Sequence, residues 1–256
     1  RADAVPETHR VPGYLSDEWR AGREFTFVDE DATSRTQTKI IGYDGGIKEL
    51  HRRARGYLAR HGVEVAQERK ATIVLGPPAS GKSSIAEEMQ ITDRAIIIDA
   101  DDVKKTLPEY GDGIGASAVH EESSDIMLEV LDAAMAAGDN LVLPKVGFRS
   151  SSIAKMIGLL KKKGYSVNVL SMRVDYPEAF RRMITRFIGT GRLVNPTFMR
   201  SVGDNPSQTY YTLKGEGKAD GFAEIDNNAP PTAPREILDD DDELLAAYGG
   251  LLRRPG

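Results

Sequence analysis

Short apolar runs recur along the middle of the chain, and segments with spaced apolar residues separate them. The runs cover residues 71–75, 95–98, 141–143 and 167–174. The segments 117–137 and 152–163 carry apolar residues at the three- and four-residue spacing of a helix. Alternation of strands with helices favours right-handed crossovers and a mostly parallel sheet. The pattern therefore predicts an α/β fold in which helices flank that sheet.

The two ends of the chain lack this alternation. Residues 1 to about 45 are rich in Asp, Thr, Arg and Gly and predict an irregular arm. A basic amphipathic helix is expected next, over 47–59, because one helical stripe collects Ile47, Leu50, Ala54, Tyr57 and Leu58. Beyond Pro206 the periodicity weakens again, and the tail carries the acidic run 239–242.

A complete phosphate-binding motif follows the first apolar run. Gly76, Pro77, Pro78, Ala79, Ser80, Gly81, Lys82 and Ser83 match the pattern G-x-x-x-x-G-K-[ST], and the helix-compatible stretch 84–90 comes next. Glycines let the backbone turn tightly, so that amide N–H groups and the positive end of the helix converge on phosphate oxygens. Lys82 supplies a cation for the terminal phosphates, and Ser83 supplies a hydroxyl for Mg²⁺. The motif predicts a site for ATP and Mg²⁺, with Ser84 at its edge.

The motif and the periodicity together predict a P-loop kinase-like architecture in three parts. Residues 1–67 form the N-terminal arm and amphipathic helix, residues 68–206 the P-loop kinase core, and residues 207–256 a C-terminal extension with an acidic tail. A chain of 256 residues with 40% hydrophobic content is long enough for one sizeable domain with such appendages.

Composition narrows the classes of partner. The net charge of −5 disfavours a protein that coats nucleic acid and favours a small anionic ligand in a local positive pocket. Cysteine is absent, which excludes disulfides, thiolate metal sites and a cysteine nucleophile. No run reaches the roughly 20 apolar residues of a membrane-spanning helix. We expect a cytoplasmic protein, and the start at Arg1 is compatible with a domain of a longer one.

An acidic cluster ends the second apolar run. Asp99 and Asp101 lie at i, i+2 spacing, so that both point to one side if the strand continues, whereas Asp102 points away or caps a helix beginning at Val103. A kinase needs one carboxylate near the attacking hydroxyl and another near Mg²⁺. Asp101 and Asp99 can divide these roles. The alternative is that all three aspartates only cap the helix.

A basic cluster lies further along, in the stretch 181–192. Asp175 and Glu178 predict the start of its helix. On that helix Arg182 and Arg186 are i, i+4 neighbours, which is unfavourable for like charges unless an anion is near. Arg192 follows in a glycine-punctuated loop. Arginines on a closing segment neutralise charge on a transferring phosphate; the alternative is a solvated basic face.

These motifs together resemble the zeta toxin family, kinases of bacterial toxin–antitoxin systems whose best-described members phosphorylate a hydroxyl of UDP-N-acetylglucosamine with ATP. The likeness covers about residues 68–206. It implies that Asp101 is the base that activates the acceptor hydroxyl, and that Lys82 and Ser83 handle phosphates and Mg²⁺. It implies further that Arg186 and Arg192 clamp the transferring phosphate. A protein antitoxin is the partner that the resemblance implies.

One stretch departs from the family pattern. Family members carry a glutamate at a strand end, and this glutamate contacts the sugar-nucleotide acceptor. This chain instead has Pro144 and Lys145 at that strand end, followed by Arg149. This departure favours an acceptor that differs from UDP-N-acetylglucosamine, such as another nucleotide-sugar or a related nucleotide metabolite, with Lys145 or Arg149 meeting an anionic part of it. The alternative is that Lys145 points to water. Glu121, which opens a long predicted helix, either lines the acceptor pocket or belongs to a helix start.

Two functions from different classes fit these residues. The first is a small-molecule kinase, a phosphotransferase with an alcohol group as acceptor. The second is a nucleotide-dependent switch or ATPase module of a larger protein, which phosphorylates no acceptor. The acids follow the second strand, as in small kinases, and no later apolar strand ends in adjacent acids as a motor ATPase requires. The position of the acids favours the kinase.

Overall fold

The computed structural model describes residues 26–28, 35–37, 44–104, 120–190, 194, 196–229, 235–240, 244 and 248, with the side chains of 26–28, 35–37, 44–49, 120–122 and 190 left out. Two compact units make up the chain. One contains residues 1–53 and 99–133, and the other contains residues 54–98 and 134–256. The second unit holds the main sheet and is the larger of the two.

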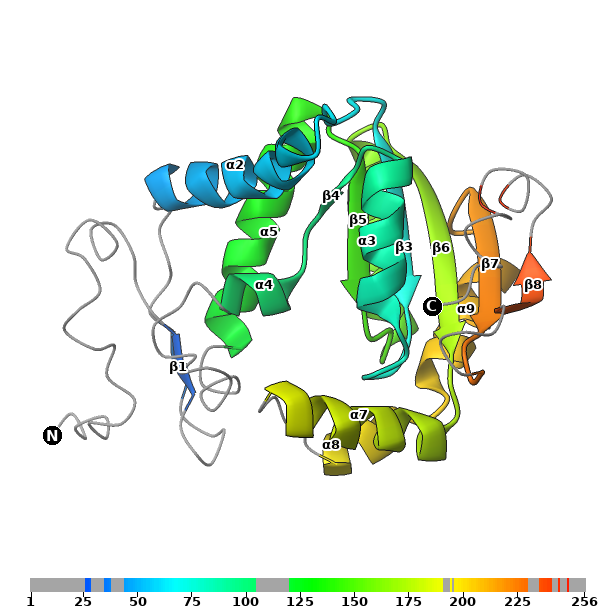
Figure 1. Cartoon of the computed structure of the whole chain (residues 1–256). Helices are drawn as coiled ribbons and strands as arrows, with labels where there is room; N and C mark the ends of the chain where they lie inside the picture. The colour runs from blue at the N-terminus through cyan, green and yellow to red at the C-terminus, as the bar shows by residue number, and fades with distance from the viewer. Residues whose placement is uncertain are drawn as a thin grey trace, which may run out of the picture. The chain divides into compact units, whose positions relative to one another are not determined.

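A six-stranded sheet forms the centre of the larger unit (Figure 1). Its strands in spatial order are β4 (Ile96–Ile97), β5 (Leu141–Lys145), β3 (Lys70–Leu75), β6 (Ser166–Arg173), β7 (Gly221–Asp226) and β8 (Glu236–Asp240). All neighbouring pairs are parallel except β7 with β8. The predicted mostly parallel α/β sheet is confirmed.

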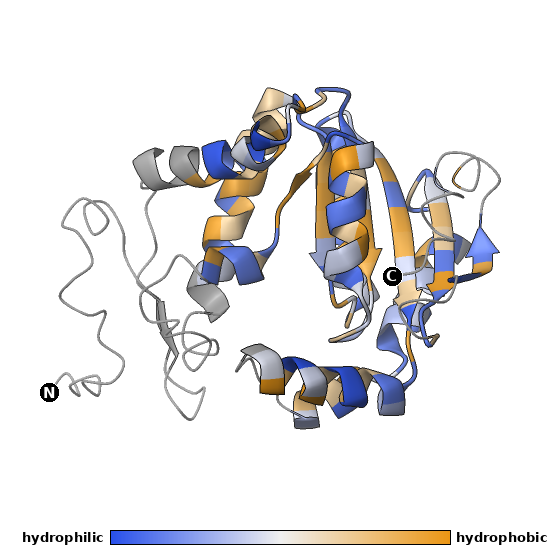
Figure 2. Ribbon diagram, in the orientation of Figure 1, coloured by the Kyte–Doolittle hydropathy of each residue, from blue (hydrophilic) through white to orange (hydrophobic). Residues whose placement is uncertain are grey.

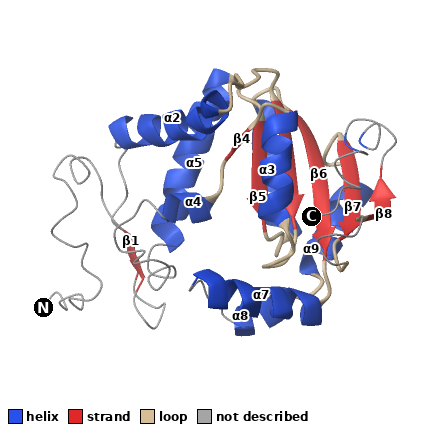
Figure 3. Ribbon diagram, in the orientation of Figure 1, coloured by secondary structure: helices blue, strands red, loops and turns tan. Residues whose placement is uncertain are grey.

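Helices of the larger unit connect these strands along the chain. They are α3 (Lys82–Thr92), α6 (Ser150–Lys162), α7 (Tyr176–Thr190), α8 (Pro196–Val202) and α9 (Asn205–Gly215). Figure 3 shows the alternation of strands with helices that the periodicity predicts. The predicted helix over 152–163 is confirmed by α6. α7 begins close to the predicted start, and the N–H of Ala179 donates to the carbonyl of Asp175 at 2.9 Å.

The two faces of the sheet are covered differently. Val74 and Leu170 point toward α3, where they pack in one buried cluster with Ile85 and Met89. The next residue, Leu75, lies on the other face, because side chains alternate along a strand. That face is covered by α6 and α9. Apolar residues follow the strands closely (Figure 2), and each fully buried aliphatic side chain contributes about 1.5–3 kcal/mol.

A buried carboxylate lies on the α9 face. Glu224 of β7 is fully buried and accepts hydrogen bonds from the hydroxyls of Ser171 at 3.0 Å, Ser207 at 2.6 Å and Tyr211 at 2.9 Å. The bond to Glu224, with partial burial, raises the pKa of Tyr211 to about 12. Three hydroxyl donors satisfy the carboxylate, so this polar residue can occupy an inner strand. It links α9 to β6 and β7.

Residues near the C-terminus complete the opposite, α3 face. Leu244 and Tyr248 are buried in the same apolar cluster, and the Tyr248 hydroxyl donates to the carboxylate of Asp93 at 2.9 Å. Burial raises the pKa of both Asp93 and Tyr248. Arg235, also buried, pairs with Glu88 of α3 at 3.2 Å. Parts of the C-terminal extension therefore belong to the hydrophobic core around α3.

The smaller unit contains β1 (Thr26–Val28) paired antiparallel with β2 (Arg35–Gln37), and the short helix α4 (Ala100–Lys104). Two longer helices run from it into the larger unit, α2 (Asp44–Arg60) and α5 (His120–Ala137). They confirm the helices predicted over 47–59 and 117–137. No described helix is long and apolar enough to cross a membrane.

Candidate functional site

The phosphate loop leaves the carboxyl end of β3, an inner strand of the sheet. β3 pairs with β5 and β6 on its two sides, and its last residue, Leu75, lies opposite Lys145 and Ser171. Ligands of open α/β sheets bind outside the carboxyl ends of such strands. The strand–loop–helix context that the motif requires is therefore present over β3, residues 76–81 and α3.

Two glycines of the motif are required by space and backbone angle. A Cβ on Gly76 would lie 2.5 Å from the Ser80 hydroxyl and 2.9 Å from the Met172 carbonyl oxygen. Gly81 has a φ of +91°, which a side chain disfavours, and its Cβ would lie 2.5 Å from the Asn227 amide nitrogen. Ala79 takes a positive φ of 62°. The loop is a tight turn in which only glycine fits at both positions.

Lys82 and the serines that follow it start α3. The Lys82 ammonium donates to the carbonyls of Gly76 and Pro77, both at 2.7 Å, and so stays folded over the loop. Ser83 and Ser84 are exposed in the first helical turn. A phosphate chain fits this arrangement, since a cation and a helix N-terminus face the same turn.

The same residues suit a magnesium ion. In phosphate-loop proteins Mg²⁺ is held by the serine hydroxyl, by phosphate oxygens and by few protein carboxylates. The exposed Ser83 hydroxyl meets that requirement. Within the described ranges no three acidic or histidine side chains gather into a metal-binding cluster. Ser83, and Asp99 further along the chain, therefore stay the predicted metal residues.

The acidic cluster is a helix start. The helix α4 begins at Ala100 and not at Val103, so the strand alternation assumed for Asp99 and Asp101 does not apply. The Asp99 carboxylate accepts from the backbone N–H of Asp101 at 3.1 Å, which is the geometry of an N-cap. Capping, the alternative considered above, is thus found for Asp99. The metal role of Asp99 stays a prediction.

Asp101 lies in the first turn of α4. Its carboxylate pairs with the ammonium of Lys104, three residues on, at 3.1 Å, and its side chain is 38% exposed. A partly exposed carboxylate that a lysine holds in place can accept a proton from a bound hydroxyl. Asp101 stays the predicted base.

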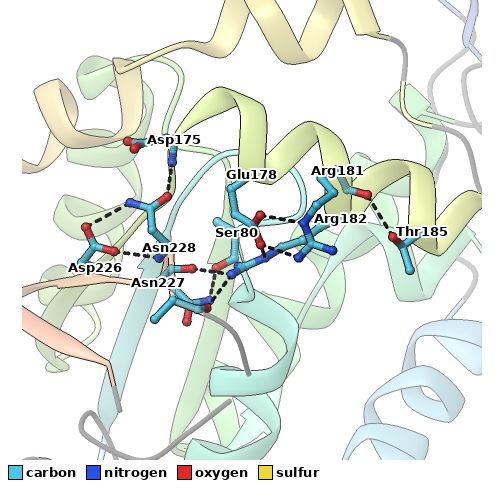
Figure 4. Close-up of polar contacts among 10 residues, drawn as sticks. Ser80, Asp175, Glu178, Arg181, Arg182, Thr185, Asp226, Asn227 and Asn228 are labelled. Atoms are coloured by element: carbon cyan, nitrogen blue, oxygen red, sulfur yellow. Dashed lines mark hydrogen bonds and ion pairs between the residues drawn. The ribbon is translucent and has the colours of Figure 1, made fainter. Parts of the chain in front are cut away.

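A cluster of charges forms the first half of α7 (Figure 4). Glu178 accepts from Arg181 at 2.7 and 2.8 Å and from Arg182 at 2.7 Å. These bonds, the one from Arg181 foremost, lower the pKa of Glu178 to about 2. Glu178 is the anion that offsets the charges of Arg181 and Arg182 within the helix. The backbone N–H of Asp175, at the predicted helix start, donates to Asn228 at 2.7 Å.

Of the two arginines predicted to clamp phosphate, Arg186 lies among the described residues and Arg192 does not. Arg186 lies on α7, half-buried, with its Nε shielded from solvent. Arg192 lies outside the described residues. Arg182, one turn before Arg186, binds the backbone carbonyls of Asn227 at 2.6 Å and Ala229 at 3.0 Å. Its guanidinium therefore holds the chain in place.

The predicted acceptor residues follow β5. Lys145 is the last residue of β5 and is half-buried. It lies opposite Leu75, the residue directly before the phosphate loop. Arg149 is exposed and precedes α6. A proline is tolerated at position 144 of β5 because the neighbouring strand β4 already ends opposite Val142. An N–H at position 144 would have no β4 residue to donate to, so the N–H that proline lacks is not needed there. Glu121 lies in the first turn of α5, and its side chain is outside the described residues.

Asn227 was missed by the sequence analysis. It follows β7, a strand whose Gly221 and Glu224 hide its apolar pattern. Its side-chain amide donates to the carbonyl of Ser80 in the phosphate loop at 2.9 Å (Figure 4). The available signal was the polar triplet Asp226, Asn227 and Asn228 after an apolar stretch, which is where a parallel strand delivers polar groups to a ligand site.

Comparison with known proteins identifies the family. The family described as zeta toxin matches residues 57–231. The chain belongs to the zeta toxin family. The matched range contains the phosphate loop, the acidic turn and α7. It also extends past the predicted core to include β7 and Asn227.

Solved structures share the fold of this family member. One comes from the PezAT chromosomal toxin–antitoxin system of the human pathogen Streptococcus pneumoniae, with 17% identity and a TM-score of 0.61 over 82% of this chain and 86% of that one. Another is the AvrRxo1-ORF1:-ORF2 complex with ATP, with 15% identity and a TM-score of 0.55 over 81% and 71%. A search of curated proteins gave no match.

Proposed function

We propose that this chain is an ATP-dependent kinase of the zeta toxin type. It transfers the γ-phosphate of ATP to a hydroxyl of a nucleotide-sugar such as UDP-N-acetylglucosamine, or of a related nucleotide metabolite. The observation that carries the proposal is the phosphate loop, in which Gly76 and Gly81 have no room for a side chain and Lys82 folds over the turn. Membership of the zeta toxin family supports it.

The transfer is a displacement at the γ-phosphorus. The acceptor oxygen forms a bond to phosphorus, the bond to the bridging oxygen of ADP breaks, and the hydroxyl proton passes to the Asp101 carboxylate. Lys82 stabilises the charge on the leaving phosphates, and Arg186 and Arg192 that on the transferring group. Ser83 and Asp99 would hold Mg²⁺, which would supply neutralisation of the phosphate charge.

The acceptor is recognised by a cationic strand end. Lys145 ends β5 beside the start of the phosphate loop, and Arg149 follows it on the same connection. Two cations on this connection favour an acceptor with a phosphate or carboxylate group. Glu121 is a further candidate contact for the acceptor. A protein antitoxin is the proposed macromolecular partner; the PezAT structure comes from a toxin–antitoxin system.

The test compares Asp101→Asn with Asp102→Asn. Asp102 is an exposed neighbour in the same helical turn and a matched control. Each protein is incubated with Mg²⁺-ATP and a panel of UDP-sugars and dinucleotides, and products are detected by mass spectrometry. We expect Asp101→Asn to lower acceptor phosphorylation by about 100- to 10,000-fold, the usual contribution of a general base. Its ATP affinity should stay within twofold of the parent, and Asp102→Asn should retain activity.

A second pair of variants tests the acceptor. Lys145→Met and Arg149→Met remove the two cations and keep most of the side-chain volume. We expect a higher KM for the phosphorylated acceptor, with little change in the KM for ATP. Hydrolysis of ATP without any modified acceptor, unaffected by Asp101→Asn, would instead support the nucleotide-dependent switch or ATPase module.

A further inference from the structure

Asn227 is held rigidly beside the phosphate loop by the sheet. The strands β6 and β7 pair in register up to Arg173 opposite Asp226. The backbone N–H of Asn227 then donates to the Arg173 carbonyl at 2.9 Å, which extends the parallel pairing by one more bond. The side chain of Asn227 is therefore directed by regular sheet geometry, which is more precise than loop geometry.

The amide of Asn227 and the phosphate loop fit each other closely. Its nitrogen donates to the Ser80 carbonyl at 2.9 Å. The same nitrogen lies 2.5 Å from where a Cβ on Gly81 would be, so the glycine leaves the space that the amide occupies. Ser80 is fully buried. A hydrogen bond to the carbonyl of a buried loop residue fixes the turn that directs the following amides toward phosphate.

The other side of the same segment binds α7. Arg182 donates to the carbonyls of Asn227 at 2.6 Å and Ala229 at 3.0 Å. Asn228 accepts from the N–H of Asp175, just before α7, at 2.7 Å, and its own N–H and amide donate to the Asp226 carboxylate at 2.7 and 3.0 Å. Residues 226–229 thus bind the start and the first turns of α7, while Asn227 binds the loop (Figure 4).

We propose that Asn227 is a positioning residue that fixes the phosphate loop and couples it to α7. Coupling matters for the proposed kinase, on which this part of the inference rests, because α7 carries Arg186 and leads toward Arg192. A shift of the loop when a nucleotide binds is passed through the Asn227 amide and backbone to the Arg182 guanidinium. Arg182 in turn is locked to Glu178 at 2.7 Å, so that the helix moves with it. One asparagine therefore fixes the positions of both the phosphate loop and α7.

Two variants of Asn227 test the contact with the loop. Asn227→Ala removes the amide, and Asn227→Asp keeps its shape while it replaces the donor with an acceptor facing the Ser80 carbonyl. The latter serves if the alanine variant fails to fold. We expect ATP affinity to fall about tenfold for Asn227→Ala and further for Asn227→Asp, the usual cost of an unmet hydrogen bond. Asn205→Ala is the control. It removes a hydrogen bond from the side-chain amide of Asn205 to the Ser201 carbonyl, away from the loop, and should bind ATP normally.

The readouts separate this inference from the proposed function. ATP affinity is measured by calorimetry with a non-hydrolysable analogue and no acceptor. Hydrogen exchange of the amides in 78–85 is measured without nucleotide, where Asn227→Ala should accelerate exchange by about tenfold. Both measurements report on Asn227 even if the protein phosphorylates no acceptor. Unchanged exchange, or analogue affinity within twofold of the parent in both variants, would overturn the positioning role.

A double-mutant cycle tests the coupling to α7. Arg182→Gln removes the guanidinium bonds to Asn227 and Ala229 without touching the loop. We expect it to lower analogue affinity about threefold in the parent and to have no further effect in Asn227→Ala, because both changes cut the same path. Equal effects of Arg182→Gln in both backgrounds would show that loop and helix are not coupled through Asn227.

Discussion

The phosphate loop and the acidic turn both follow strands of one sheet, but they obtain their geometry in different ways. The loop is shaped by residues far away in sequence, since Met172 limits the space at Gly76 and Asn227 limits it at Gly81. The acidic turn is built by near neighbours, with Asp99 capping the N–H of Asp101 and Lys104 pairing with Asp101. A motif that is local in sequence can therefore depend on tertiary contacts for its shape.

The difference predicts how damage spreads. A change in the loop meets a backbone carbonyl or a side chain fixed by the sheet, and neither can move cheaply. A change in the acidic turn alters one short helix and the bonds within it. We expect substitutions in the loop to reduce nucleotide binding strongly, and those in the turn to alter local stability more than nucleotide affinity.

Within this comparison, the largest effect on nucleotide binding is expected for Gly76→Ala. The added methyl group would lie 2.9 Å from the Met172 carbonyl and 2.5 Å from the Ser80 hydroxyl. Overpacking of this kind costs about 1–3 kcal/mol, so ATP affinity measured by calorimetry should fall roughly 10- to 100-fold.

The matched control for that change is Gly158→Ala. Gly158 lies in α6, where an added Cβ meets nothing within 4 Å, and alanine there should raise stability by about 0.5–1 kcal/mol with ATP affinity unchanged. Normal ATP binding by Gly76→Ala would show that the loop can relax away from Met172, contrary to the comparison.

An intermediate effect is expected for Asp99→Ala. Loss of the N-cap bond to Asp101 should destabilise α4 by about 1 kcal/mol, seen as faster hydrogen exchange over 100–104. Asp99→Asn keeps a side-chain acceptor and should keep α4 intact. If Asp99 also serves Mg²⁺, Asn at this position should raise the magnesium concentration needed for activity while helix exchange stays normal. Equal exchange in all three proteins would rule out the capping role.

The smallest effect concerns the pH dependence of the charges on α7. The pKa of Glu178 falls from its usual 4.5 to about 2, chiefly because Arg181 donates to it. A lowered pKa means that this stabilisation is complete above about pH 4.5 and is lost as the pH falls toward 2. The free energy of unfolding of the parent minus that of Glu178→Gln, from urea titrations, should be about 0.5–1 kcal/mol near neutral pH.

That difference should stay constant between pH 5 and 8 and shrink below about pH 4.5. Asp175→Asn is a suitable control, because Asp175 lies just before the same helix and is contacted through its backbone N–H. A difference that grew on acidification would mean that Glu178 is not stabilised as the anion.

Much of the core could be predicted from local patterns. The apolar runs at 71–75, 141–143 and 167–174 became the inner strands β3, β5 and β6. The strands β7 and β8 were not predicted, because Glu224 interrupts the apolar pattern of one and acids dominate the other. Glu224 can be buried in β7 because Ser171, Ser207 and Tyr211 donate hydrogen bonds to it. Only the folded chain brings these three donors together.

The sequence alone determined the phosphate loop, the alternation of strands with helices and the likeness to zeta toxins, because glycine positions and apolar periodicity act over short distances. The tertiary structure decided what surrounds the loop. It brought Asn227 to Ser80, 147 residues away in the chain. It also gave Arg182, expected only as a member of a basic cluster, a hydrogen bond to the backbone carbonyl of Asn227 beside the loop. Such contacts depend on strand order and register, which no local pattern encodes.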